Sequence, residues 1–159
     1  MNRRDLFKTA AALPFAANAA TPAAWKPDVF DDHQNQTVMA LIDLVIPQTD
    51  TPGAKAALAN RYIDLFLRDG DSSERERFLS GIAMLDARAI NTYRHPFITC
   101  TAAQQTELLT TLDQAAAPFF RHAKAVTSRL YYSTEPGFRE LNKGGRLPST
   151  FGCTHTNHG

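Results

Sequence analysis

The side chains whose types and spacing come nearest to a chemical site are Cys153, His155 and His158, close to the C-terminus. Thiolate and imidazole groups bind zinc and copper, so this set could hold a metal and make the chain a metal protein or enzyme in its own right. The three residues fall in the last seven of the chain, however, without a neighbouring segment that would hold them in one geometry. We therefore expect no metal site and keep the metal protein as an alternative.

Scattered histidines and carboxylates are the other groups able to do acid–base chemistry. His95 precedes a proline and His122 falls within an expected helix, as capping or surface histidines do. Asp43, Asp64 and Asp86 each fall within an expected helix, and no spacing brings two of them together, so we interpret them as solvated or salt-bridged. No phosphate loop, dinucleotide fingerprint, haem attachment motif or nucleophile elbow is present. The sequence therefore predicts no catalytic or cofactor-binding residue in this chain.

The two cysteines, Cys100 and Cys153, leave three states open. An internal disulfide across this span would stabilise the fold by roughly 4 kcal/mol on the chain-entropy model. Cys153 could instead bond a partner chain, or both thiols could be free. Sequence does not choose between them, because bridging depends on geometry.

The N-terminus has the pattern of a twin-arginine export signal. Arg3 and Arg4 stand ahead of Phe7 and Lys8, and a weakly apolar, alanine-rich run follows over residues 9–20. The twin-arginine translocase carries proteins that are already folded, often around a cofactor. Since this chain has no cofactor motif of its own, the signal would serve to export something bound to it, and we expect a periplasmic protein.

A cleavage site and a domain division follow from the same segment. Ala17 and Ala19 form a small-x-small site, with cleavage expected after Ala19. We expect residues 1–19 to be the signal, 20–29 a linker and 30–159 a single helical domain.

Removal of the signal leaves a nearly neutral chain. The whole chain has 17 basic and 16 acidic residues, and residues 1–19 contain three of the basic and one of the acidic residues. The chain after the signal therefore keeps 14 basic and 15 acidic residues. No basic patch remains, which argues against nucleic-acid binding and electrostatic membrane attachment. No later apolar run approaches the ~20 residues of a membrane span. We expect contact with a membrane only indirectly, through a partner.

Apolar residues at steps of three and four predict an all-α fold, a compact bundle of about five helices. The first helix is expected to begin near Asp31 and to end at Pro47. The second carries a wide apolar stripe through Tyr62 and Leu65, and Gly70 is expected to end it as a left-handed cap.

Capping residues mark the remaining helices. Ser72 or Ser73 is expected to cap the third helix, in which Gly81 suggests close contact with another helix. Thr101 opens a fourth helix with a capping-box pattern, and Pro118 suits the first turn of a fifth. From residue 133 onward, prolines and glycines rule out a long regular element, so we expect a long irregular C-terminal tail.

A stretch rich in turn-forming residues separates the first two helices: Ile46-Pro47-Gln48-Thr49-Asp50-Thr51-Pro52-Gly53-Ala54. Together with Tyr62-Ile63-Asp64, Phe78-x-x-Gly81-Ile82, Phe119-Phe120, Tyr131-Tyr132-Ser133 and Gly152-Cys153, this stretch resembles the gluconate 2-dehydrogenase subunit 3 family. The resemblance covers almost all of the chain after the signal.

The resemblance implies a small exported subunit that is not itself catalytic. Its partner would be a large FAD-dependent dehydrogenase of the glucose/methanol/choline class, which oxidises sugars, sugar acids or glycosides and holds the FAD. A cytochrome c subunit with haem c is a possible third component. The small subunit would stabilise the flavoprotein and escort it through the twin-arginine translocase. A transient export chaperone that leaves the dehydrogenase after export is the alternative.

We expect the partner to contact the turn-rich stretch and the aromatic residues of the tail, because aromatic side chains are common anchors at interfaces. The alternative is that the tail packs only on its own bundle, fixed by a disulfide between Cys100 and Cys153. The candidate interface residues are Pro47, Thr49, Asp50, Pro52, Gly53, Tyr131, Tyr132, Phe138, Phe151 and Cys153.

Overall fold

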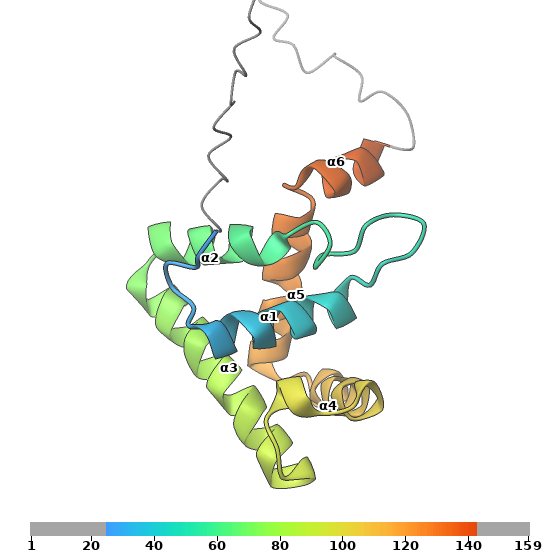
Figure 1. Cartoon of the computed structure of the whole chain (residues 1–159). Helices are drawn as coiled ribbons and strands as arrows, with labels where there is room; N and C mark the ends of the chain where they lie inside the picture. The colour runs from blue at the N-terminus through green and yellow to red at the C-terminus, as the bar shows by residue number, and fades with distance from the viewer. Residues whose placement is uncertain (1–24, 143–159) are drawn as a thin grey trace, which may run out of the picture.

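A computed structural model of the chain describes residues 25–142, and this part is all-helical, as predicted. The export signal, its cleavage site, Phe151, Cys153, His155 and His158 lie outside the described residues. Within residues 25–142, six α-helices and one 3-10 turn follow one another (Figure 1): α1 (Asp32–Val45), α2 (Ala59–Asp69), α3 (Ser72–Tyr93), η1 (Phe97–Thr99), α4 (Ala102–Gln114), α5 (Pro118–Tyr131) and α6 (Glu135–Leu141).

Capping boxes fix the starts of α1 and α4. The Asp31 carboxylate accepts the Gln34 N–H at 2.7 Å, and the Gln34 side chain accepts the Asp31 N–H at 3.0 Å. Thr101 and Gln104 repeat this reciprocal pair at α4, which confirms the predicted box. Each box satisfies backbone donors that a helix start otherwise leaves unpaired.

The junction between α2 and α3 differs from the prediction. Gly70 has an extended conformation, with φ −84°, and is not a left-handed cap. The Arg75 guanidinium instead donates to the carbonyl oxygens of Leu67 and Arg68, each at 2.9 Å. Asp71, and neither serine, caps α3, because its carboxylate accepts the Ser73 N–H at 3.3 Å.

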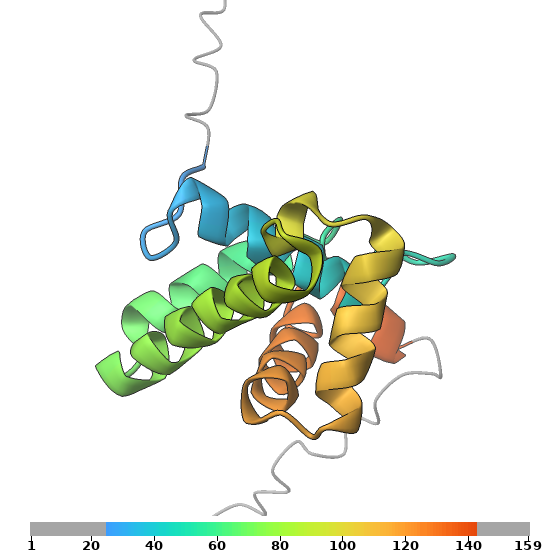
Figure 2. The same ribbon diagram turned by 90° about the horizontal axis from the view of Figure 1, so that it is seen from below.

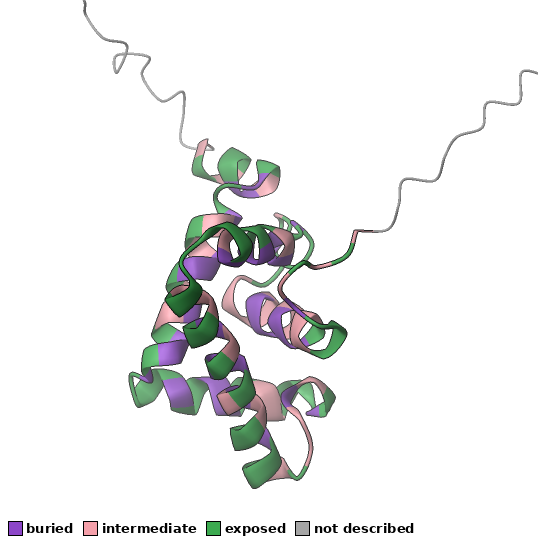
Figure 3. Ribbon diagram, turned by 90° about the vertical axis from the view of Figure 1, so that its left-hand side faces the viewer, coloured by how far each residue is buried: buried purple, intermediate pink, exposed green. Residues whose placement is uncertain are grey.

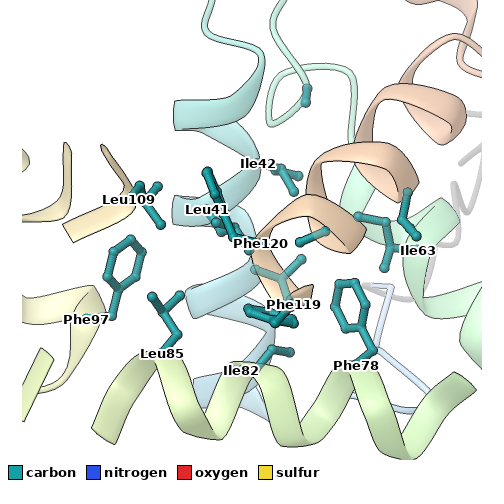
Figure 4. Close-up of a cluster of buried hydrophobic side chains, with 14 of the residues drawn as sticks. Leu41, Ile42, Ile63, Phe78, Ile82, Leu85, Phe97, Leu109, Phe119 and Phe120 are labelled. Carbon is teal, nitrogen blue, oxygen red and sulfur yellow. The ribbon is translucent and has the colours of Figure 1, made fainter. Parts of the chain in front are cut away.

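Helix α5 is the centre of the bundle and packs against each of the other five α-helices. Figure 2 shows it between α3 and α4. Phe119 and Phe120 project from α5 into the core, among apolar side chains of α1, α3 and α4 (Figure 4). Gly81 makes the close contact that was predicted for it: a Cβ there would lie 1.8 Å from Cδ2 of Phe119.

A short helix, α6, occupies part of the segment predicted to be irregular. The Thr134 hydroxyl accepts the Gly137 N–H at 3.2 Å and caps the helix, and Pro136 occupies its first turn, where a missing N–H costs nothing. Buried residues face the interior of the bundle, whereas much of α6 is exposed (Figure 3). None of the helices between residues 25 and 142 combines the length and apolarity needed to cross a membrane.

Candidate partner-binding site

The turn-rich stretch between α1 and α2 forms a closed loop. The Ala54 N–H donates to the Ile46 carbonyl at 2.9 Å, which joins the two ends. Gly53 is buried beneath this closure, and a Cβ there would lie 2.6 Å from both the Ile46 oxygen and the Gln48 nitrogen. A side chain at position 53 would therefore force the loop open.

The loop is attached to the C-terminal part of the bundle through Tyr131. The Tyr131 hydroxyl lies 2.9 Å from the Pro52 carbonyl oxygen and 2.7 Å from Oε2 of Glu140 on α6. Thr51 donates its hydroxyl to the same carboxylate oxygen at 3.2 Å. Burial, and then the Glu140 carboxylate, raises the pKa of the Tyr131 hydroxyl to about 12. The loop and α6, 89 residues apart in sequence, are thus held together.

A surface groove of about 320 Å³ follows this junction. It is lined by two residues of the loop and four of α6, namely Thr51, Pro52, Glu135, Pro136, Arg139 and Glu140. The structure therefore brings two parts of the predicted interface, the loop and the start of the C-terminal segment, to one surface.

The predicted interface residues differ in exposure. Tyr131 is only 1% exposed and holds the loop from inside the bundle. Tyr132 and Phe138 are 39% and 56% exposed, so their rings are accessible to a partner. Of the predicted loop residues, Pro47, Thr49, Asp50 and Pro52 are exposed, whereas Gly53 is buried.

Asp64 has a structural role that sequence reasoning missed. This carboxylate on α2 is 1% exposed, and it is neither solvated nor salt-bridged as expected. It accepts the backbone N–H groups of Asp28, Val29 and Phe30 at 2.8, 3.0 and 3.1 Å. Its position among apolar residues of α2 was the available signal, since buried carboxylates require partners.

The other two carboxylates fit the expected pattern of paired side chains. Asp43 lies 3.5 Å from the Lys55 ammonium on the surface. One oxygen of Asp86 lies 2.6 Å from Nε2 of His33, and the other accepts the Phe97 N–H at 2.9 Å.

The remaining candidate groups also have local partners. Nδ1 of His95 lies 3.6 Å from the Cys100 sulfur, and burial raises the pKa of that thiol, which disfavours the reactive thiolate. Nε2 of His122 lies 2.5 Å from the Glu74 carboxylate. Between residues 25 and 142, no group of three histidine, cysteine, aspartate or glutamate side chains is placed to hold a metal ion.

An exposed apolar stripe on α2 is a second feature that the sequence did not reveal. The sequence predicted a wide apolar stripe for this helix without showing which of its side chains the core would cover, and Leu58, Tyr62 and Leu65 are 41%, 39% and 39% exposed. Ile63 and Leu67, on the opposite face, are fully buried. The helix therefore presents apolar side chains to the core and to the surface.

Comparison with known proteins identifies one relationship. Residues 32–145 match the family model described as gluconate 2-dehydrogenase subunit 3. No curated protein and no solved structure gives a significant match to the chain.

Proposed function

Because the chain belongs to the gluconate 2-dehydrogenase subunit 3 family, and so to the small subunits of dehydrogenase complexes, we propose that it is the non-catalytic partner of a periplasmic flavoprotein. That flavoprotein is an FAD-dependent dehydrogenase of the glucose/methanol/choline class, which oxidises sugars, sugar acids or glycosides. A cytochrome c subunit would accept its electrons. The observation that carries this proposal is the family match, which spans the whole helical body from α1 to α6.

The geometry of the polar groups supports a role in binding. Asp64 holds three backbone amides, Asp86 pairs with His33 and with a backbone amide, and His122 contacts Glu74. These contacts stabilise helix ends and helix pairs within the bundle, which suits a rigid partner subunit. Sugar oxidation with a dye acceptor is therefore expected to require the flavoprotein. Robust turnover by the isolated chain, free of flavin, would contradict the proposal.

The proposed second role is export. The flavoprotein would fold around FAD in the cytoplasm, bind this chain and cross the membrane on the signal that begins with Arg3 and Arg4. Support for this step comes from the sequence: a signal for folded cargo stands on a chain without a cofactor motif.

Replacement of both signal arginines by lysine tests the export role. Arg3→Lys/Arg4→Lys should leave the flavoprotein and its dye-linked activity in the cytoplasmic fraction. Arg88→Lys, a change of the same chemistry at an exposed position of α3, serves as the control and should leave export unchanged. Normal periplasmic activity in the double variant would mean that the flavoprotein does not depend on this signal.

A further inference from the structure

Exposed apolar side chains concentrate at one end of the molecule. Figures 1 and 3 place α2 and α6 together at this end. The C-terminal end of α3, where Ile90 falls, lies at the opposite end (Figure 1). Among the described residues, six of the seven exposed large hydrophobic side chains belong to α2 or its N-cap, to the segment that follows α5, or to α6: Leu58, Tyr62, Leu65, Tyr132, Phe138 and Leu141.

The stripe on α2 is regular. Tyr62 and Leu65 are three residues apart, which places them on one face of the helix, and Leu58 is the N-cap residue immediately before it. A surface helix of a globular protein normally carries polar residues on its outer face. Leu58 also has a left-handed backbone, with φ 57°, a conformation that costs a leucine about 1 to 2 kcal/mol. The structure thus holds an exposed leucine in a strained position at the start of α2, as functional sites often do.

A groove continues the stripe toward α5. Tyr62, Leu65 and Phe66 of α2 line it together with Leu130 of α5, and its volume is about 440 Å³. Aromatic side chains beside a groove are common anchors of protein interfaces.

Two arginines flank this apolar face, and neither pairs with a carboxylate of the described residues. The guanidinium of Arg61 lies 5.1 Å from the centre of the Trp25 ring, and that of Arg129 lies 4.5 Å from the centre of the Phe66 ring. Neither arginine is within 4 Å of an Asp or Glu carboxylate in the part of the chain that the structure describes. A complementary surface would be apolar at its centre and would carry carboxylates at its rim.

The charges favour a different protein over this chain itself as the occupant. Residues 143–159 contain no aspartate or glutamate side chain to pair with Arg61 or Arg129. A second copy would bring the same arginines, and the carboxylate in its groove, Asp69, is already bonded to Arg68 at 2.7 Å.

We propose that the α2 face, defined as Leu58, Arg61, Tyr62, Leu65 and Arg129, is the surface on which the catalytic flavoprotein subunit docks. This inference rests on the proposed function and names the part of the chain that performs it. Tyr132 and Phe138, at the same end of the molecule, extend the contact toward the loop and α6.

Leu65→Glu in the chain co-expressed with the flavoprotein tests the α2 face. It introduces a charge at an exposed helical position without touching the core. The amount of flavoprotein that co-purifies should fall at least tenfold. Ile90→Glu, at a position 44% exposed on α3, is the matched control and should retain the flavoprotein. Full retention by Leu65→Glu would overturn the docking surface and leave the proposed function standing. Absence of the flavoprotein from the unmodified chain would overturn both.

Footprinting of the assembled complex gives a second measurement that does not depend on a disruptive variant. Leu65→Cys should react with maleimide in the isolated chain and be protected in the complex, as measured by peptide mass spectrometry. Ile90→Cys should react in both. Equal labelling of Leu65→Cys in both states would contradict docking on α2. Protection already in the isolated chain would mean that the chain or a second copy covers α2, and would overturn the proposal.

Discussion

The buried carboxylate of Asp64 accepts the backbone N–H of Phe30 at 3.1 Å, across 34 residues of sequence. The same carboxylate also binds the N–H groups of Asp28 and Val29. Phe30 is itself in the core, 5% exposed and 6.2 Å from the ring of Phe78. One side chain of α2 therefore fixes the segment that enters α1.

Asp64→Asn should detach this segment. An amide offers one acceptor oxygen and points N–H donors at backbone N–H groups, so at least one buried donor loses its partner. We expect a loss of about 2 to 4 kcal/mol in the free energy of unfolding. Hydrogen exchange of the amides of Asp28 to Phe30 should rise well above that of α3.

Asp43→Asn is the control for this substitution. Asp43 pairs with Lys55 on the surface, where both side chains are more than 40% exposed, and such pairs contribute less than about 1 kcal/mol. Equal losses in the two variants would show that Asp64 does not anchor the segment.

Tyr131→Phe tests the attachment of the loop to α6. The variant keeps the ring and loses the hydroxyl contacts with Pro52 and Glu140, at an expected cost of about 1 to 2 kcal/mol near neutral pH. Exchange protection at the Ala54 amide should fall with it.

The same variant has a pH signature. The folded state raises the pKa of Tyr131 from 10.0 to about 12, so the stabilising effect of its proton is complete below pH 10 and is lost as pH rises through about 12. The stability difference between the wild type and Tyr131→Phe should shrink over this range, by up to about 2 kcal/mol. Chemical unfolding at pH 9 and pH 12, about one unit below and two above the ordinary tyrosine pKa, measures this difference. If the difference in unfolding free energy between the two proteins is the same at both pH values, the raised pKa of Tyr131 is contradicted.

Gly81→Ala should destabilise the bundle despite the better helix propensity of alanine. The added methyl group would lie 1.8 Å from the Phe119 ring, and overpacking of this kind costs about 1 to 3 kcal/mol, against about 1 kcal/mol gained from propensity. Denaturant unfolding measures the change. Ser80→Ala, on the exposed side of the same helix, should be nearly neutral, and Gly81→Ala/Phe119→Leu should recover part of the loss. A Gly81→Ala variant as stable as Ser80→Ala would contradict the contact.

Cys100 should resist alkylation in the native protein. Its sulfur is buried beside His95 and Pro96, and burial raises the pKa of the thiol. We expect alkylation at least about tenfold slower than in denaturant. Rapid native labelling would contradict this burial. A non-reduced mass lower by two hydrogens, with Cys153 linked to Cys100, would identify the internal disulfide among the three open states.

Local signals in the sequence were sufficient to predict most of the helical fold. The capping box at Thr101 and the proline in the first turn at Pro118 depend on residues within one helical turn, so they can be recognised without knowledge of the rest of the chain. Helix α6 was missed because Pro136 and Gly137 suggested an interruption. In the structure the proline occupies the first turn, and Gly137 packs where a Cβ would lie 2.1 Å from the Tyr131 carbonyl oxygen.

The candidate site could be predicted only in part. The loop was recognised as a partner contact from its turn-forming residues. The C-terminal segment was recognised from the several aromatic residues it contains. Its long-range contacts could not be recognised, because the pairing of Thr51 with Glu140 depends on the packed bundle. The exposed stripe on α2 was missed for a related reason: periodicity shows that Tyr62 and Leu65 are apolar at helical spacing, but not which face of the helix the other helices cover.

Affinity purification of the chain from cells that also express the glucose/methanol/choline-class flavoprotein tests the proposed partnership. We predict that the purified material contains both chains, shows the absorption bands of oxidised flavin and reduces a dye acceptor when a sugar substrate is added. Purification of a colourless, inactive chain alone, while the flavoprotein is folded, active and exported without it, would contradict its role as a subunit of this dehydrogenase.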